Sequence, residues 1–155
     1  VTDINEQKLK AIADKYKVKI IAPEAVYATE ADIYAPCALG ASLYSETIPQ
    51  LKVQIVAGAA NNQLSDEIVH GQQLKDRGII YAPDFLINGG GVINCYREVQ
   101  NLSAETTMQL VETIYDKTLQ VLQRAQRDNS TPQETAITIA QERIEQVKKE
   151  RKNAR

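Results

Sequence analysis

Two stretches of the sequence place asparagines next to glycines in a pattern that could bind a small polar ligand. Residues 58–64 (GAANNQL) contain Asn61, and residues 83–94 (PDFLINGGGVIN) contain Asn88 followed by three glycines. Asparagine amides can recognise a carboxamide or a ribose, and a glycine-rich backbone lets N–H groups meet an anion or a nicotinamide ring. A second interpretation stays open, because asparagine and glycine also favour turns and a glycine run can be a hinge.

Asp3 and the small residues of 35–41 (APCALGA) are two further candidates. Asp3 follows the first predicted strand, where a carboxylate can accept hydrogen bonds from both ribose hydroxyls of an adenine nucleotide. It can equally start the turn into the next helix. The small side chains of residues 35–41 let the backbone approach a flat ligand, or let the loop pack tightly on the sheet.

The remaining reactive side chains offer little chemistry. Cys37 has no histidine near it in the sequence, so we expect a small buried apolar residue rather than a nucleophile. The single histidine, His70, lies in a predicted helix, and we expect it on the surface or packed against another element. The two cysteines lack metal-ligand spacing, and the chain has neither a GxGxxG turn nor a P-loop. We therefore predict no metal site.

The elements that must position these residues alternate between short apolar runs and amphipathic stretches. This pattern is typical of a doubly wound, mostly parallel α/β sheet, in which ligands bind at the carboxyl ends of the strands. The first predicted strand ends at Asp3, and four further strands are predicted over residues 18–23, 32–38, 53–60 and 78–83. The predicted helical segments are one capped by Asn5, a short turn at Pro23, and one from the cap Ser65 to about Lys75 that stops at Gly78.

After the glycine run, which ends at Gly91, two long amphipathic helices follow a boundary near Asn101. One begins at about Ser103, and the other begins with a capping box of Thr131 and Glu134. The apolar faces expected to be buried are, in the three amphipathic helices in chain order, Leu9, Ile12, Ala13 and Tyr16; Val111, Ile114, Tyr115, Thr118 and Leu122; and Ile137, Ala140, Ile144 and Val147.

Length and composition fit one globular domain, since 43% of the 155 residues are hydrophobic and 25% are charged. The net charge of -2 disfavours nucleic acid and anionic membranes as partners. We also expect no membrane span and no signal peptide, and the two cysteines are typical of a cytoplasmic protein. Because Val1 opens directly on a strand-like run without methionine, we expect a fragment of a longer protein.

Six motifs, in this order and spacing, resemble the C-terminal half of the leucine-type members of the glutamate, leucine, phenylalanine and valine dehydrogenase family. They are DIYAPCALGA, TIPQLK, IVAGAANNQL, HGQQL, GIIYAPDFLINGGGVIN and AQERIEQV. The resemblance implies an enzyme that deaminates an L-amino acid oxidatively to the 2-oxo acid, with NAD as the cofactor. It implies that residues 1–101 form a partial Rossmann NAD-binding domain that lacks its first strand and glycine-rich turn. Residues 102–155 would be helices that pack back on a missing substrate domain.

The same resemblance assigns cofactor-binding residues. Asp3 would hold the adenosine ribose and favour NAD over NADP, because a carboxylate repels a 2′-phosphate. Asn61 would lie near the nicotinamide ribose, with Ala59 beside it in the same loop. Asn88 would face both the nicotinamide and the substrate carboxylate. The other positions assigned to the nucleotide are Ala35, Pro36, Cys37, Ala38, Leu39, Gly89 and Gly90.

Val111 and Ile114 would shape the pocket for the substrate side chain. No catalytic residue is assigned in this chain, because the family's two lysines and aspartate belong to the substrate domain. Gly89 departs from the family pattern, which has alanine there; this change would loosen the loop without removing its contacts.

Three functions therefore remain in view. The first is the cofactor-binding part of a leucine or branched-chain amino acid dehydrogenase, and the second is its counterpart in a phenylalanine or tryptophan dehydrogenase. The third is a non-catalytic fragment that binds a nucleotide or only mediates oligomerisation. The resemblance implies a homo-oligomer for the complete enzyme. We also expect the fragment alone to associate with another copy of itself, because a sheet without its first, central strand leaves strand edges unpaired.

Overall fold

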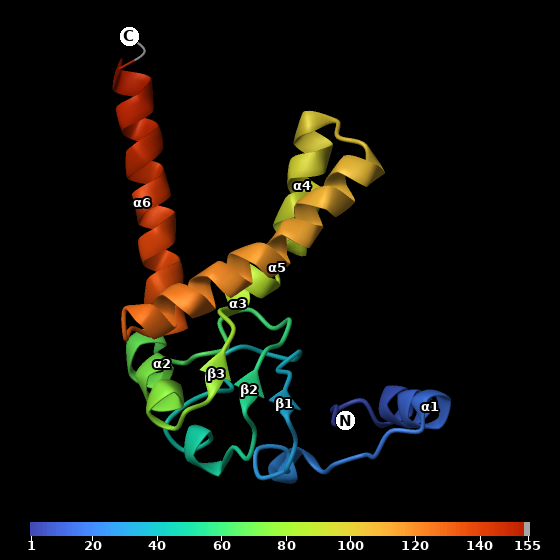
Figure 1. The fold of residues 1–155 in the computed structure, drawn as a ribbon. Coiled ribbons are helices and arrows are strands. Elements are labelled where there is room, and N and C mark those ends of the chain that lie inside the picture. Colours follow the sequence, from blue (N-terminus) through green and yellow to red (C-terminus); the bar gives the residue numbers. More distant parts are fainter. Residues whose placement is uncertain (154–155) are drawn as a thin grey trace.

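The computed structural model describes residues 1–153, which form an α/β structure with a small parallel sheet and projecting helices (Figure 1). The strands β1 (Ile33–Tyr34), β2 (Ile55–Val56) and β3 (Ile80–Tyr81) lie in the order β1-β2-β3. Both pairings are parallel, and they align Ile33, Ile55 and Ile80 across the sheet. The predicted α/β class with a parallel sheet is confirmed. Ala154 and Arg155, the last residues of the predicted C-terminal region, lie outside the described residues.

The core lies around this sheet and the helix α2 (Glu67–Asp76), which connects β2 to β3. Its members are the buried residues Leu43, Ile48, Leu51, Val56, Leu64, Leu74, Ile79 and Tyr81. The side chain of Arg77 donates hydrogen bonds to the carbonyl of Ile48 and, at 2.8 Å, to that of Leu51. These bonds fasten the short helix η2 (Ile48–Gln50) beneath α2.

The start of α2 differs by one residue from the prediction. The cap is Asp66, not Ser65, and its carboxylate accepts hydrogen bonds from the N–H groups of Ile68 at 3.0 Å and Val69 at 2.8 Å. A carboxylate is the stronger acceptor here, because its charge also interacts favourably with the positive end of the helix dipole. Gly78, at φ +69°, follows the helix where the sequence predicted its stop.

The N-terminal segment departs most from the prediction, since the expected strands at residues 1–3 and 18–23 are absent. The two stretches still meet: the Val1 amino group donates to the Lys19 carbonyl at 2.7 Å, and the Ile21 N–H donates to the Val1 carbonyl at 2.9 Å. Between them, α1 (Glu6–Tyr16) begins at the predicted cap Asn5 but buries none of its own residues. Its expected buried face is therefore wrong in this chain. The predicted turn at Pro23 is the short helix η1 (Pro23–Ala25).

The glycine run proves to be helical, although the sequence predicted a loop. A one-turn helix α3 (Asp84–Ile87) follows β3, and α4 (Gly90–Gln100) begins within the glycines themselves. The predicted starts of the two long helices are confirmed. Ser103 caps α5 (Ala104–Arg127) by accepting a hydrogen bond from Thr106 N at 3.1 Å. The capping box at Thr131 opens α6 (Pro132–Asn153).

The predicted buried face of α6 is wrong in this chain: Ile137 is 37% exposed and Ile144 is 55% exposed. The helix contacts α2 and α5, and its buried residues Gln133, Thr135 and Ala136 all lie near its start. Beyond these contacts α6 projects away from the sheet (Figure 1). On α5, Tyr115 of the predicted stripe is 72% exposed, and the buried positions are Thr107, Val121 and Ala125.

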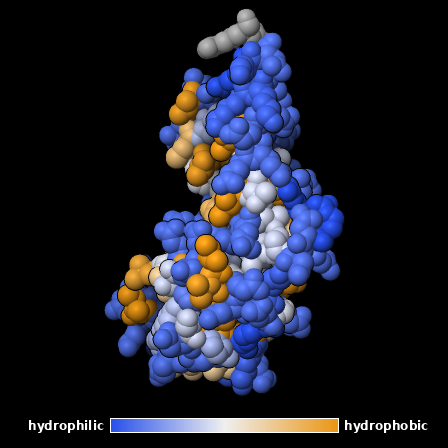
Figure 2. Space-filling view, turned by 90° about the vertical axis from the view of Figure 1, so that its left-hand side faces the viewer, coloured by the Kyte–Doolittle hydropathy of each residue, from blue (hydrophilic) through white to orange (hydrophobic). Residues whose placement is uncertain are grey.

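The space-filling view shows the consequence of this arrangement. Hydrophobic side chains, drawn in orange, appear on the upper part of the molecule, where the helices project from the sheet (Figure 2). Exposed apolar residues on these helices include Val92 and Val99 of α4, at 75% each. In residues 1–153, no helix is both long and apolar enough to cross a membrane.

Candidate functional site

Three loops begin at the same edge of the sheet, because β1, β2 and β3 are parallel. Backbone hydrogen bonds join the loop after β1 to the loop after β2. Ala60 N donates to the Pro36 carbonyl at 2.9 Å, and Ala41 N donates to the Asn62 carbonyl at 2.6 Å. A parallel bridge between Leu43 and Leu64 closes the pair of loops. Residues 35–43 and 57–65 therefore run side by side above the carboxyl ends of the strands.

Two glycines permit this close approach. A Cβ on Gly58 would overlap the backbone nitrogen, the carbonyl oxygen and the Cδ of Pro36, and one on Gly40 would lie 2.6 Å from the Asn61 carbonyl oxygen. Gly40 thus serves packing between the loops, which was the second interpretation of the 35–41 stretch, and Gly58 serves it from the loop after β2. Pro36 is buried, but Ala35, Cys37, Ala38 and Leu39 are exposed. The same loop thus packs through some residues and offers others to a ligand.

The two predicted asparagines meet at this edge. Asn88 Nδ2 donates to Asn61 Oδ1 at 2.6 Å. Asn61 belongs to the loop after β2, whereas Asn88 caps the C-terminal end of α3. With one hydrogen bond used between them, the amide nitrogen of Asn61 and the amide oxygen of Asn88 remain for a ligand. A donor and an acceptor presented together complement a primary carboxamide.

The structure adds two buried polar residues that the sequence reasoning missed. The Gln63 amide, fully buried, donates to the carbonyls of Gly58 at 2.7 Å and Ala60 at 2.9 Å. Its backbone N–H donates to Asp84 Oδ2 at 3.3 Å. Asp84 is only 6% exposed, and its own N–H donates to the Tyr81 hydroxyl at 3.4 Å. In the sequence both looked like ordinary turn or helix-start residues.

Burial raises the pKa of Tyr81, and the negative charge of Asp84 raises it further. The Tyr81 phenol therefore stays neutral over the whole physiological range. Its hydroxyl is consequently available as a hydrogen-bonding group beside the Asp84 carboxylate, not as a second negative charge.

The other predicted cofactor positions lie in different surroundings. Asp3 is exposed, and its Oδ1 accepts a hydrogen bond from Asn5 N at 2.7 Å, which is the turn alternative left open for this residue. Within residues 1–153, no hydrogen bond links the segment 1–22 to the three loops. Gly89 caps α4 and Gly90 is its first residue; a Cβ on Gly90 would meet nothing within 4 Å. Ala59, in the loop after β2, is exposed.

The two predicted substrate positions, Val111 and Ile114, are both half-buried on α5, the helix that packs against α3 and α4. One turn of helix separates them, so they share a face of α5. Their helix therefore lies next to the segment that carries Asn88. The apolar surface they offer is compatible with an uncharged ligand group.

The reactive side chains set aside earlier have structural roles or are simply exposed. His70 is buried in α2, where its Nδ1 accepts a hydrogen bond from Asp66 N at 2.8 Å and its Nε2 lies 3.3 Å from Ser45 Oγ. The expectation of a helix-packing histidine is thus fulfilled. Cys37 is exposed, so the expectation of a buried cysteine is wrong. The described residues contain no group of three or more histidine, cysteine or acidic side chains placed to hold a metal ion.

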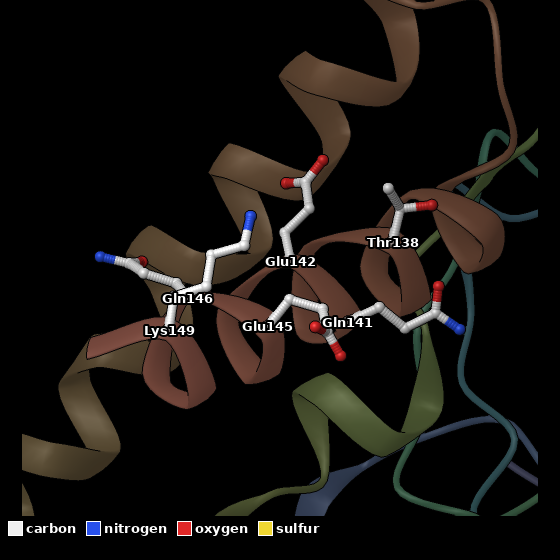
Figure 3. Close-up of a pocket in the computed structure, with 6 residues that line it drawn as sticks. All are labelled: Thr138, Gln141, Glu142, Glu145, Gln146 and Lys149. Atoms are coloured by element: carbon white, nitrogen blue, oxygen red, sulfur yellow. The ribbon is translucent and has the colours of Figure 1, made fainter. Parts of the chain in front are cut away.

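A hollow of about 430 Å³ lies along α6, away from the loop edge, and Figure 3 shows its side chains. All six lining residues, Thr138, Gln141, Glu142, Glu145, Gln146 and Lys149, come from this one helix. The Glu142 carboxylate is already engaged by Arg124 in two bonds of 2.6 and 2.7 Å. A surface formed by a single helix cannot enclose a ligand, so the loop edge is the better candidate site.

Comparison with known proteins yields a consistent set of relatives. A family model described as Glutamate/Leucine/Phenylalanine/Valine dehydrogenase matches residues 1–152. The leucine dehydrogenase of Thermoactinomyces intermedius is 46% identical over 151 residues, which cover 97% of this chain and 41% of that protein. The phenylalanine dehydrogenase of Bacillus thermotolerans is 43% identical over 149 residues, which cover 93% of this chain and 39% of that protein.

A solved structure agrees with these relatives. The crystal structure of L-tryptophan dehydrogenase from Nostoc punctiforme matches with a TM-score of 0.91 at 39% identity. This match covers 94% of this chain and 44% of the solved chain. The chain therefore spans less than half the length of these relatives.

Proposed function

This chain belongs to the glutamate, leucine, phenylalanine and valine dehydrogenase family, and we propose that it is the cofactor-binding part of an NAD-dependent amino acid dehydrogenase. A bound nicotinamide would accept a hydride from the L-amino acid, and water would then hydrolyse the resulting imino acid to the 2-oxo acid with release of ammonia. Since the chain spans 41% of its leucine dehydrogenase relative, the activity is proposed for a longer protein. We take residues 1–101 as its partial Rossmann domain and residues 102–155 as helices that pack on a separate substrate domain.

The observation that carries this proposal is the pair formed by Asn61 and Asn88. Their amides present a donor and an acceptor above the carboxyl ends of three parallel strands, and this is where nucleotides bind in such sheets. The pair fits the carboxamide of a nicotinamide ring and would fix which face of the ring meets the substrate. The small exposed residues Ala35 and Ala38 leave space for the flat rings of the nucleotide.

The choice of NAD over NADP rests on Asp3. Asp3 is exposed near the start of the chain, so its carboxylate is accessible to a ribose. In this proposal it accepts the two ribose hydroxyls and repels a 2′-phosphate. The diphosphate of the cofactor would be held by a glycine-rich turn outside this sequence, at a helix N-terminus.

For the substrate we propose leucine or another branched-chain amino acid. Val111 and Ile114 supply an apolar surface of moderate size beside α3, which suits an aliphatic side chain. An aromatic substrate is the alternative, because relatives named for phenylalanine and tryptophan also match. Homo-oligomeric assembly and a cytoplasmic location belong to the same proposal. A non-catalytic nucleotide-binding or oligomerisation fragment is the remaining alternative.

The test is NAD reduction by the complete protein with leucine, valine, isoleucine, phenylalanine and tryptophan, supplied one at a time. We expect the highest kcat/KM with leucine. A preference for phenylalanine or tryptophan would replace the proposed substrate class and keep the dehydrogenase. If none of the five amino acids supports NAD reduction, the proposed dehydrogenase activity is contradicted and the non-catalytic alternative is favoured.

The role of the asparagine pair is tested by Asn88→Ala in the complete protein. Loss of one hydrogen bond to the carboxamide is expected to raise the NAD dissociation constant about tenfold. Asn94→Ala is the matched control, because Asn94 is an exposed asparagine of α4 in the same stretch of sequence. An unchanged dissociation constant in the Asn88 variant would remove this pair from the cofactor site.

A further inference from the structure

We infer that Gln63 and Asp84 are positioning residues that set the distance and orientation of the Asn61–Asn88 pair. The inference rests on the proposed function, because it gives that pair its purpose. Neither Gln63 nor Asp84 is expected to touch the cofactor, since Gln63 is fully buried and Asp84 is 6% exposed. They act through the two loops that carry the asparagines.

The side chain of Gln63 braces the loop after β2 from within. Its Nε2 donates to the carbonyls of Gly58 and Ala60, at 2.7 and 2.9 Å, and both of these residues come just before Asn61 in the sequence. Both partners are carbonyl oxygens, which can only accept, so the amide nitrogen must face them and the amide cannot be flipped. The turn that presents Asn61 is therefore held by one side chain at two points.

Asp84 connects this braced loop to α3. Its Oδ2 accepts the backbone N–H of Gln63 at 3.3 Å, while its carbonyl accepts the N–H of Asn88 at 2.9 Å. The two segments are thus joined twice, by the buried bond between Gln63 and Asp84 and by the exposed bond between Asn61 and Asn88. Asp84 and Asn88 are one turn of α3 apart and share a backbone hydrogen bond. A change in the Gln63–Asp84 bond is therefore expected to shift the Asn61–Asn88 bond.

Packing alone does not require these residues. Apolar side chains of similar volume would fill the same space without the desolvation cost of a carboxylate and an amide. What the polar residues add is direction, because a hydrogen bond fixes the orientation of the backbone groups it joins and an apolar contact does not. Fixed orientation is what a site needs in order to hold a ring within about 0.5 Å of its reactive position.

The first experiment compares two buried glutamines in the complete protein. Gln63→Glu keeps the shape of the side chain but turns oxygens toward the two carbonyls. Gln133→Glu makes the same change at a residue that is 2% exposed at the start of α6 and takes no part in the hydrogen bonds around Asn61 and Asn88. Both variants are expected to lower the melting temperature. Only Gln63→Glu is expected to raise the NAD dissociation constant, by about tenfold, measured by calorimetric titration.

Equal effects of the two variants on NAD affinity, or none from either, would overturn the positioning role. If Gln63→Glu does not fold, Gln63→Met takes its place, since methionine has a similar length, no charge and no donor. The Gln63→Glu variant has a second readout. At lower pH the introduced carboxyl takes up a proton and regains one donor, so its NAD affinity should recover toward that of the unsubstituted protein.

A double-mutant cycle separates this inference from the function on which it rests. If Gln63 acts through Asn61, then Gln63→Glu should add less than about twofold to the NAD dissociation constant once Asn61→Ala is present. Additive effects, with Asn61→Ala itself weakening NAD, would overturn the brace and leave the cofactor site standing. No effect of Asn61→Ala on NAD affinity would overturn the cofactor site, and the positioning role with it.

Discussion

Asn61 and Asp3 are both polar residues that follow a predicted strand, yet the chain surrounds them very differently. Asn61 lies in a loop that is hydrogen-bonded to a second loop and to the end of α3, above a core of eight buried residues. Asp3 lies in the segment 1–22, where no residue is buried. A polar residue at a strand end thus becomes part of an assembled edge only where neighbouring strands are present to build that edge.

The reason lies in how parallel strands are stabilised. Each needs hydrogen bonds from partners that are distant in the sequence. β2 has partners on both sides, whereas β1 is paired only with β2 among the described residues. Residues 1 and 19–21 share only two backbone bonds, too few to form a ladder. The loop edge is consequently held by contacts within the chain, whereas the segment 1–22 buries none of its own residues.

The largest expected difference between the two regions is in the cost of truncating an apolar side chain. Leu74, at 0% exposed, lies in the core, so Leu74→Ala should lower the free energy of unfolding by about 3 kcal/mol. Ile12 of α1 is 44% exposed, and Ile12→Ala should cost less than about 1 kcal/mol, because alanine also favours the helix. Urea denaturation of the 155-residue chain measures both values.

Repeating this pair in the complete protein sharpens the comparison. If the rest of the polypeptide covers α1, the cost of Ile12→Ala should rise toward that of Leu74→Ala. A cost that stays small in the complete protein would mean that α1 is exposed there as well, and our explanation of the N-terminal segment would fail.

A smaller effect is expected from the close contact between the loops after β1 and β2. Gly58→Ala should cost about 2 kcal/mol, because the added Cβ overlaps Pro36 and forces the loops apart. Gly91→Ala is the matched control, since a Cβ there meets nothing within 4 Å and alanine suits the first turn of α4. Thermal unfolding of both variants measures the difference. Equal stabilities would show that the loop contact is loose and that Asn61 is not held by it.

These differences also explain how much the sequence predicted. Local signals identified the caps Asn5, Ser103 and Thr131, because capping depends on residues only a few positions apart. Local periodicity likewise placed the three observed strands. It also predicted strands at 1–3 and 18–23. These do not form because strands need tertiary contacts, and in the described residues no neighbouring strand pairs with either stretch.

The candidate site shows the same division. Asn61 and Asn88 stood out by residue type, and their contact follows from the parallel order of β2 and β3. Gln63 and Asp84 could not be singled out, because their importance arises from burial, which no local pattern reports. The apolar face of α6 was recognised correctly as apolar but wrongly as buried here, since burial needs a surface to cover it.

A further contrast lies within α6, whose start is fastened while the remainder projects. Thr131 Oγ1 accepts the Glu134 N–H at 3.2 Å and donates to its carboxylate at 2.8 Å. Thr131→Ala should therefore cost about 1 kcal/mol at neutral pH. Thr138 is exposed on the same helix, so Thr138→Ala should change the free energy of unfolding very little. Chemical denaturation at several pH values compares the two variants.

The pH dependence of this cost has a definite sign. Hydrogen bonds from the Thr131 hydroxyl and then from its backbone N–H lower the pKa of Glu134. The ionised carboxylate thus stabilises the fold above its unfolded pKa of about 4.3, and this contribution is lost as the pH falls through the lower folded value. The difference between the unsubstituted chain and Thr131→Ala should shrink in that range. A difference that does not depend on pH would contradict the capping box.

The smallest expected effect concerns Tyr34 on β1, an edge strand of the three-stranded sheet. Burial, and then the charge of the neighbouring Tyr27, raise the pKa of Tyr34 to about 12. The unfolded value is about 10, so the neutral phenol stabilises the fold below pH 10, and this contribution is lost as the pH rises through the folded value. Tyr34→Phe should therefore lose less stability than the unsubstituted chain between about pH 10 and 12. Part of the alkaline loss will persist in the variant, because burial also raises the pKa of Tyr81. The free energy of unfolding of both proteins is measured by urea denaturation as the pH rises. An equal loss in both would show that water reaches Tyr34 in the folded chain and that β1 belongs with the exposed segment 1–22, not with the core.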